Sequence, residues 1–244
     1  MSKSTTPGEI RPVSSGDEVF ATGRLVGDGG TARLDAVGRG FYDQIIRDAG
    51  GISVATDLAS DLASGDLVTV QGIWTGESIR NAVVVDIVDP IYMPDRLGDG
   101  IKPEIVPAGR LSREEILAAP VLAIAKELSN EKLLFYCAYK LTDGWIGMAC
   151  ATDSGPVEQA LGSVLGNALV VVEVDWTVHD LKLIDRFFAE YDFAEGLLSF
   201  GKFMDPVGQF KSYALVRMTT PKMASTLSPV DPNALVLTSW IQRT

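Results

Sequence analysis

The stretch FYCAYKLTDGWIGMACATD at residues 135–153 is nearly repeated earlier in the chain, as FYDQIIRDAGGISVATD at residues 41–57. Both stretches begin with Phe-Tyr, pass through a turn with Asp and Gly, and end in Ala-Thr-Asp. A pattern that returns at a fixed distance indicates a duplicated structural unit. The sequence therefore predicts two related units within its 244 residues.

The similarity continues past these stretches, because each Ala-Thr-Asp precedes a short helical pattern and then a β-branched run that ends in Trp-Thr. The spacing of equivalent residues grows from 94 at Phe41 and Phe135 to 102 at Trp74 and Trp176. The additional residues fall in the turn and the helix, where repeats tolerate insertions. Each copy is expected to run strand, turn, strand, helix, strand.

The strands expected at 18–26, 66–74 and 79–88 complete the first unit. A small β unit with a helix between its third and fourth strands resembles the OB-fold, and the stretch GDLVTVQG at 65–72 carries this resemblance best. The resemblance covers residues 17–90 and, less fully, 121–176. We therefore predict a mainly β protein with helical insertions, made of two tandem OB-like five-stranded barrels, the second of them enlarged.

Four regions follow from this reading. They are a flexible N-terminus at 1–16, an OB-like barrel at 17–90, a Pro/Gly-rich linker at 91–111 and a second OB-like barrel with a helical insertion at 112–244. Ser112 and Glu115 form a capping box for a helix that Pro120 interrupts. The stretch Asn-Ala-Leu-Val occurs at both 167–170 and 233–236, but four residues are too few to indicate a third copy.

The composition limits the classes of partner. With 46% hydrophobic residues the chain can bury real cores, and its net charge of −11 counts against non-specific binding of duplex DNA. A single strand can still bind an acidic protein through a local groove and stacking. No signal-peptide pattern is seen, and the longest apolar run, 116–125, is too short to span a bilayer. We expect a soluble, cytoplasmic protein with no membrane partner.

The hairpin around Asp143-Gly144 fixes a pairing register if these two residues form its turn. In that register Cys137 faces Cys150, at a distance where a strained disulfide is possible. With two cysteines and no export signal, we favour reduced, buried thiols. No His/Cys cluster indicates zinc, and no cofactor is expected.

Alternation along the strands sorts buried from outward side chains. Phe135 and Cys137 share an inward face with the next two odd positions, so Tyr136 is expected to point outward. The same phase places Tyr42 outward on the second strand of the first barrel. Trp74 and Trp176 are in phase with valines and are expected to lie in the core.

The chain lacks a recognisable catalytic constellation. His179 is its only histidine, and Thr177 with Asp180 has the spacing of a helix cap, which leaves His179 facing solvent. Gly-x-Ser-x-Gly does not occur, and the scattered acids near 175–195 are typical of an acidic chain rather than of a metal site. We predict that the protein is not an enzyme.

Tandem barrels of this kind resemble single-stranded nucleic-acid-binding proteins of the replication protein A type. The resemblance implies a non-catalytic binder of single-stranded DNA or RNA, with bases stacked on Tyr42 and Tyr136. Backbone contacts would come from Arg47, Arg80 and Lys140. The alternative is a protein-binding adaptor or inhibitor that uses the same barrels or the 178–204 insertion, where LLSFGKFM at 197–204 is either an exposed patch or the end of a buried helix.

Overall fold

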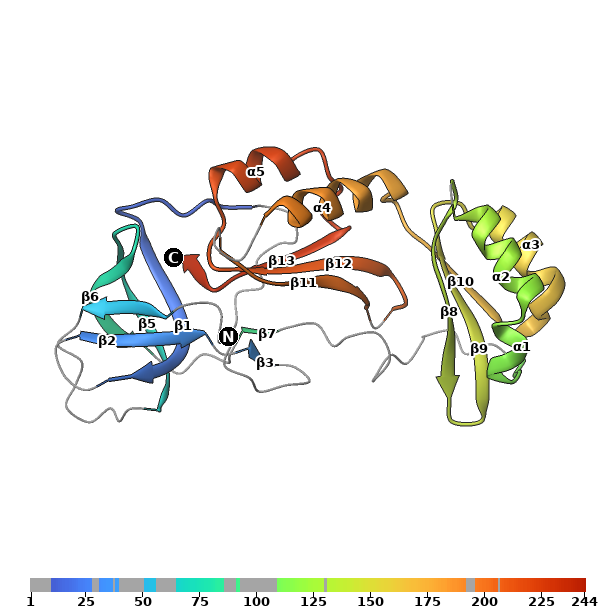
Figure 1. Ribbon diagram of the computed structural model, residues 1–244, viewed down its shortest axis with the longest axis horizontal. Helices are drawn as coiled ribbons and strands as arrows, with labels where there is room; N and C mark the ends of the chain where they lie inside the picture. Colours follow the sequence, from blue (N-terminus) through green and yellow to red (C-terminus); the bar gives the residue numbers. More distant parts are fainter. Residues whose placement is uncertain are drawn as a thin grey trace.

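The computed structural model describes a mainly β chain that combines one closed barrel with two α/β modules (Figure 1). The described residues are 10–27, 31–36, 38–39, 51–55, 65–85, 91–92, 109–129, 131–191, 196–205 and 207–244. None of the helices within these ranges combines the length and hydrophobicity that crossing a bilayer requires.

The barrel occupies the N-terminal part of the chain. Its strands are β1 (Glu18–Val26), β2 (Thr31–Ala36), β4 (Ile52–Ala55), β5 (Leu67–Trp74) and β6 (Ser78–Val85). They follow one another in the order β1-β2-β4-β6-β5, and the antiparallel pairing of β5 with β1 closes the barrel. The pair β4 and β6 is parallel. This order is compatible with an OB-fold, and it confirms the barrel predicted for the first unit.

Alternation produces the barrel core, as expected for strands with one buried face. On β1, Val19, Ala21 and Leu25 point inward and are at most 3% exposed. Trp74 at the end of β5 is 2% exposed, so its predicted core position is confirmed. Next to the barrel, the short strands β3 (Gly38–Arg39) and β7 (Ile91–Tyr92) pair in parallel.

The structure shows no second barrel among the described residues. Instead, β8 (Leu133–Leu141), β9 (Gly144–Ala151) and β10 (Leu169–Glu173) form an open sheet in the order β10-β9-β8. The helices α1 (Arg113–Ile116), α2 (Ala119–Leu128) and α3 (Ser154–Leu165) cover one of its faces (Figure 1). Ser112 and Glu115 form the predicted capping box at α1, and the break at Pro120 is also confirmed.

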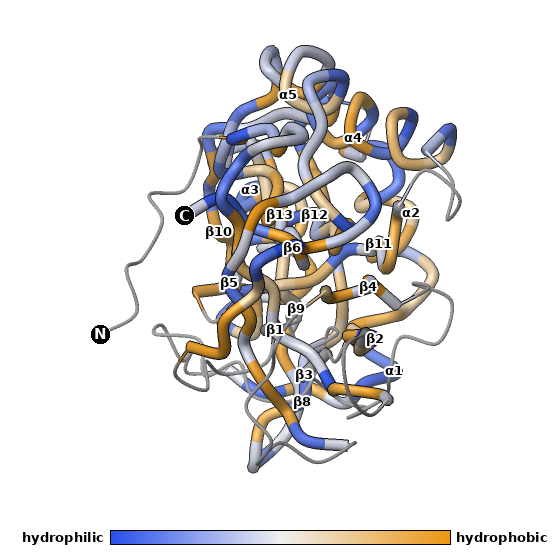
Figure 2. The backbone as a smooth tube through the Cα atoms, turned by 90° about the vertical axis from the view of Figure 1, so that its left-hand side faces the viewer, coloured by the Kyte–Doolittle hydropathy of each residue, from blue (hydrophilic) through white to orange (hydrophobic). Residues whose placement is uncertain are grey.

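A second module repeats this order of elements. It contains α4 (Val178–Glu190), β11 (Leu197–Met204), β12 (Phe210–Val216), α5 (Pro221–Leu227) and β13 (Leu235–Ser239). Its sheet has the order β11-β12-β13, with β12 parallel to β13 as β9 is parallel to β10. Along α4 and α5 hydrophobic and hydrophilic residues alternate, which Figure 2 shows by colour. Each module therefore runs helix, hairpin, helix, parallel strand.

The registers of the two modules match in detail. A register shift follows the first residue of the first strand in both, at Leu133 and at Leu197. The two Asn-Ala-Leu-Val stretches then begin at Asn167 and Asn233, each two residues before the parallel edge strand. These two four-residue stretches therefore occupy equivalent positions in the two modules. The repeated unit is a helix, a hairpin, a second helix and a parallel strand, and not a barrel.

The similarity between residues 41–57 and 135–153, from which the repeat was predicted, does not correspond to a repeated fold. In the barrel, β4 pairs with β2 and with β6, so its antiparallel partner is 31–36, whereas the partner of β9 is β8. Phe41 lies outside the described residues. Both Ala-Thr-Asp stretches begin at the last residue of a strand, Ala55 of β4 and Ala151 of β9, and both tryptophans lie at or after the end of one. The similarity thus reflects local strand ends in two unlike topologies.

The C-terminal segment joins the barrel to the second module. The last strand, β14 (Ile241–Arg243), pairs with β1 in the barrel sheet, although it belongs to the predicted second domain. Leu198, Leu215 and Trp240 pack with the barrel core. The two modules meet where Phe135 stacks on Phe210, with ring centroids 4.2 Å apart.

Candidate functional site

Three arginines lie on the outer surface of neighbouring barrel strands. The register pairs Arg24 of β1 with Asp35 of β2, and Arg33 of β2 with Ser53 of β4. On the next strand, Arg80 of β6 pairs with Ala55 of β4. We refer to the surface formed by Arg24, Arg33, Asp35, Ser53 and Arg80 as the arginine face.

Alternation fixes the outward direction of these side chains. Leu34, Val54 and Ile79 immediately follow or precede members of the arginine face and are completely buried in the barrel. A residue next to a buried one on a strand points to the opposite side. Gly51 leaves room for the side chain of Arg33 in this direction, because a Cβ at Gly51 would overlap the aliphatic part of Arg33.

The charge of the arginine face is opposite to that of the whole chain. Arg33 donates from Nε and Nη2 to the two carboxylate oxygens of Asp35, at 2.7 and 3.0 Å. This hydrogen bond raises the pKa of Arg33 above its ordinary value. Within the described part of the chain neither Arg24 nor Arg80 forms an ion pair. The face therefore carries three cations against one aspartate, on a protein with a net charge of −11.

Exposed apolar side chains continue this surface on the adjoining strands. Ile73 of β5 pairs with Arg80 and is 37% exposed, and Val83 further along β6 is 58% exposed. Isolated exposed valines are ordinary, but here they lie beside cations on the same barrel wall. The combination offers charge and apolar contact to one extended ligand.

Of the residues predicted from the sequence to contact a ligand, Arg80 belongs to the arginine face. Tyr42 and Arg47 lie outside the described residues. Lys140 is exposed, but it pairs with Trp145 in the sheet of the first module, so the fold does not place it with Arg80 on one sheet. Sequence reasoning missed Arg24 and Arg33, although the alternation of 18–26 and 31–36 marks both as outward.

The expected outward orientation of Tyr136 is wrong. Its ring packs with the helical layer of the first module, and its hydroxyl donates to the carbonyl oxygen of Ile116 at 2.9 Å. Burial raises the pKa of this hydroxyl far above its ordinary value. The odd-numbered side chains of β8 face the other side of the sheet, where Phe135 and Cys137 pack against the second module. Both faces of β8 are covered in part, which alternation alone cannot reveal.

The predicted pairing of Cys137 with Cys150 is also wrong. The hairpin turns at Thr142-Asp143, so Leu141 pairs with Gly144 and each later partner shifts by two residues. Cys137 therefore faces Met148, and Cys150 faces Phe135. Both cysteines are free, as predicted, and burial raises the pKa of each thiol to about 11.

The predicted 178–204 insertion is part of the second module. His179 is exposed in the first turn of α4, and the capping box of Thr177 and Asp180 is present, as the spacing predicted. Residues 197–204 are strand β11, neither a helix end nor a loop patch, and Leu197 and Leu198 are 7% exposed. This segment therefore offers little apolar surface to a partner.

No group of three or more His, Cys, Asp or Glu side chains within the described ranges is arranged to hold a metal ion. Comparison with known proteins adds no family: no protein-family model and no curated protein matches the chain. The functional argument therefore rests on the arginine face and on the surfaces of the two modules.

Proposed function

We propose that the protein is a non-catalytic binder of single-stranded nucleic acid that uses the arginine face of an OB-type barrel. The observation that carries the proposal is the placement of Arg24, Arg33 and Arg80 on neighbouring strands of a closed barrel in an acidic chain. Barrels of the OB type commonly bind oligonucleotides on the outer surface of their second and third strands. Here these strands are β2 and β4.

The chemistry of the face suits a flexible strand. Neighbouring strands lie about 4.8 Å apart, so Arg33 and Arg80, two strands apart, can reach different phosphates of one backbone. A guanidinium group holds a phosphate through two parallel hydrogen bonds, and its plane can also stack on a base. Tyr42 remains a predicted stacking residue, and Arg47 a predicted phosphate contact.

The same charge pattern argues against duplex DNA as ligand. Duplex binding without sequence preference draws on many phosphate contacts over a broad cationic surface. The chain has a net charge of −11, so it offers a duplex few cations beyond the arginine face. A single strand can follow the face alone.

The proposal is tested by fluorescence anisotropy with a labelled oligodeoxythymidine of about 15 nucleotides and its RNA counterpart, a length that covers one OB barrel. Binding is expected to weaken strongly between about 50 and 200 mM salt. The double variant Arg24→Ala/Arg80→Ala is expected to bind at least about tenfold more weakly and with a shallower salt dependence, because two phosphate contacts are lost.

Lys126→Ala provides the matched control, because Lys126 is an exposed cation on α2 in the first module. It removes one positive charge without touching the barrel, so binding should stay unchanged. Absence of binding at low salt, or an equal loss in the control, would refute the proposal.

A further inference from the structure

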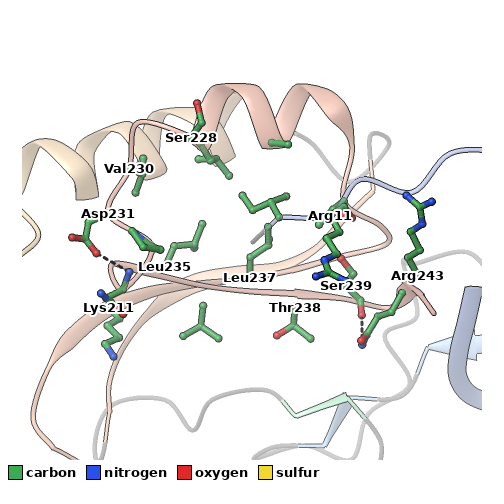
Figure 3. A pocket seen from close by; sticks show the side chains of 18 of the residues that line it. Arg11, Lys211, Ser228, Val230, Asp231, Leu235, Leu237, Thr238, Ser239 and Arg243 are labelled. Atoms are coloured by element: carbon green, nitrogen blue, oxygen red, sulfur yellow. Dashed lines mark hydrogen bonds between the residues drawn. The ribbon is translucent and has the colours of Figure 1, made fainter. Parts of the chain in front are cut away.

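A groove of about 880 Å³ runs along β13 and lies beneath α5 (Figure 3). Leu235 to Ser239 line it without interruption, so the whole length of β13 forms one wall. The end of α5 and the following loop form the opposite wall, through Leu227 and Val230. Ile10 and Arg11, from the N-terminal part of the chain, also line it.

The wall formed by β13 is a strand edge that no strand of the described residues covers. In the described part of the chain β13 pairs only with β12, and it is the outer strand of its sheet. Ser212 N–H donates to Ala234 O, and Trp240 N–H donates to Val216 O, both at 2.9 Å. Even-numbered residues of this segment therefore bond inward to β12. The register turns the N–H and C=O groups of Leu235 and Leu237 toward the groove.

The charges of the groove are unequal at its two ends. Lys211 lines the end near Asp231, but it pairs with Asp205 at 2.8 Å and is only 16% exposed. At the other end, near Ser239, lie Arg11 and Arg243 (Figure 3). Arg243 also pairs with Asp17 at 3.4 Å, yet 53% of its side chain stays exposed. The charged side chains that line this end of the groove are thus both arginines, on a protein with a net charge of −11.

We propose that β13 accepts an extended acidic segment of a partner protein as an additional strand. The open N–H and C=O groups of Leu235 and Leu237 would pair with its backbone, and Arg11 with Arg243 would hold an acidic side chain at its end. Addition of a strand to an exposed sheet edge is a general mode of peptide recognition, in which the backbone supplies affinity and neighbouring pockets supply specificity.

The groove is separate from the arginine face, so this function is additional to the proposed nucleic-acid binding. The double variant Arg24→Ala/Arg80→Ala should therefore bind the peptide normally, whatever it does to oligonucleotide binding. The two proposals can fail independently.

The test uses fluorescence anisotropy with the full chain and a labelled peptide of about nine residues, alternating valine and threonine, with three glutamates at one end. Both polarities of the peptide are titrated, together with a twin that carries lysines instead of glutamates. The glutamate peptide of one polarity is expected to bind, and Arg11→Glu/Arg243→Glu is expected to weaken it at least about tenfold. Lys182→Glu, an exposed cation on α4, is the control.

Backbone pairing is tested separately by methylating the peptide. One peptide carries N-methyl groups at odd positions and another at even positions. Only one set points toward β13 in an added strand, so one peptide should lose binding and the other keep it. Equal effects of the two peptides, or equal binding of the lysine twin, would overturn the proposal.

Two other occupants of the groove are distinguished by further measurements. Analytical ultracentrifugation would detect a dimer, and a dimer abolished by Arg243→Glu would overturn the proposal in favour of a second copy. Peptide binding that is seen only after deletion of residues 1–9 would likewise overturn it, because the N-terminal segment would then be the occupant. Binding to the intact monomer supports a partner protein.

Discussion

The indole N–H of Trp240 donates to the carbonyl oxygen of Thr22 at 2.8 Å, so the end of the second module is fastened to the first strand of the barrel. Trp240 is 1% exposed and lies between β13 and β14, with its backbone N–H bonded to Val216. The junction of barrel and module is therefore a shared core rather than a flexible contact. The two parts should unfold together.

Trp240→Phe is expected to lower the free energy of unfolding by about 2 kcal/mol, because a buried hydrogen bond and part of a large side chain are lost. Urea unfolding followed by circular dichroism measures the effect. Trp145→Phe is the matched control: Trp145 is partly exposed, and the guanidinium carbon of Arg113 lies 5.8 Å from its ring centroid, so the loss of stability should be smaller. An equal loss in both variants would contradict the shared core.

Tyr136→Phe tests whether Tyr136 stabilises the first module, as its hydrogen bond indicates, or binds a base, as the sequence predicted. Removing the hydroxyl leaves the carbonyl oxygen of Ile116 without this donor, so we expect a loss of about 1 kcal/mol in stability. Oligonucleotide binding should not change, because the ring lies under the helices of the first module. A variant of normal stability with weakened oligonucleotide binding would show that the orientation seen here is not the functional one.

Tyr42→Ala is the complementary change in the barrel. If Tyr42 stacks a base, this variant should weaken oligonucleotide binding by about 1–3 kcal/mol, which is the usual value for one stacked base. The salt dependence should stay the same, since no cation is removed. A changed salt slope would indicate a disturbed arginine face instead.

The sequence placed the barrel strands β1, β5 and β6, because each has one buried and one outward side, but it missed β2 at 31–36 and put the second strand at Phe41 and Tyr42 instead. Alternation there predicts both the core position of Trp74 and the outward position of Arg80. In β8 both faces carry apolar residues and both are partly covered, so alternation could not decide where Tyr136 points. The same ambiguity allowed a wrong register for the hairpin of β8 and β9. The predicted turn was Asp143-Gly144, whereas the observed turn is Thr142-Asp143, and the partners therefore differ by two residues.

The repeat of the two modules was visible only as Asn-Ala-Leu-Val. The remaining similarity is one of topology and register, since the helices and hairpins share positions but few side chains. The arginine face depends on pairing between strands distant in sequence, which no local pattern supplies. The open edge of β13 depends on the order of its sheet in the same way.

The thiols of Cys137 and Cys150 should be unreactive near neutral pH. Burial raises the pKa of each to about 11, so almost no thiolate, the reactive species, exists at pH 7. Alkylation by iodoacetamide should be slow in the native protein, rise with pH toward about 11 and become fast in urea. Mass spectrometry gives the rates. Rapid alkylation of either native cysteine at pH 7 would be inconsistent with this burial.

The capping box of α4 should make the stability of the fold depend on pH in the acidic range. Burial of the Asp180 carboxyl acts to raise its pKa, but hydrogen bonds from Thr177 and from the N–H of Asp231 outweigh burial and lower the pKa. A carboxyl with a lowered folded-state pKa stabilises the fold above its unfolded pKa of about 3.9, and this contribution is lost as the pH falls through the folded-state value.

Asp180→Asn should therefore reduce the loss of stability on acidification below about pH 4, measured as the shift of the urea midpoint with pH. Thr177→Ala should lower stability by about 1 kcal/mol at neutral pH, because the first turn of α4 loses its side-chain cap. Ser163→Ala serves as the comparison, since its hydroxyl donates back to the Ala160 carbonyl oxygen within α3 and caps no helix. If the acid dependence of Asp180→Asn equals that of the unchanged protein, Asp180 is not the titrating cap.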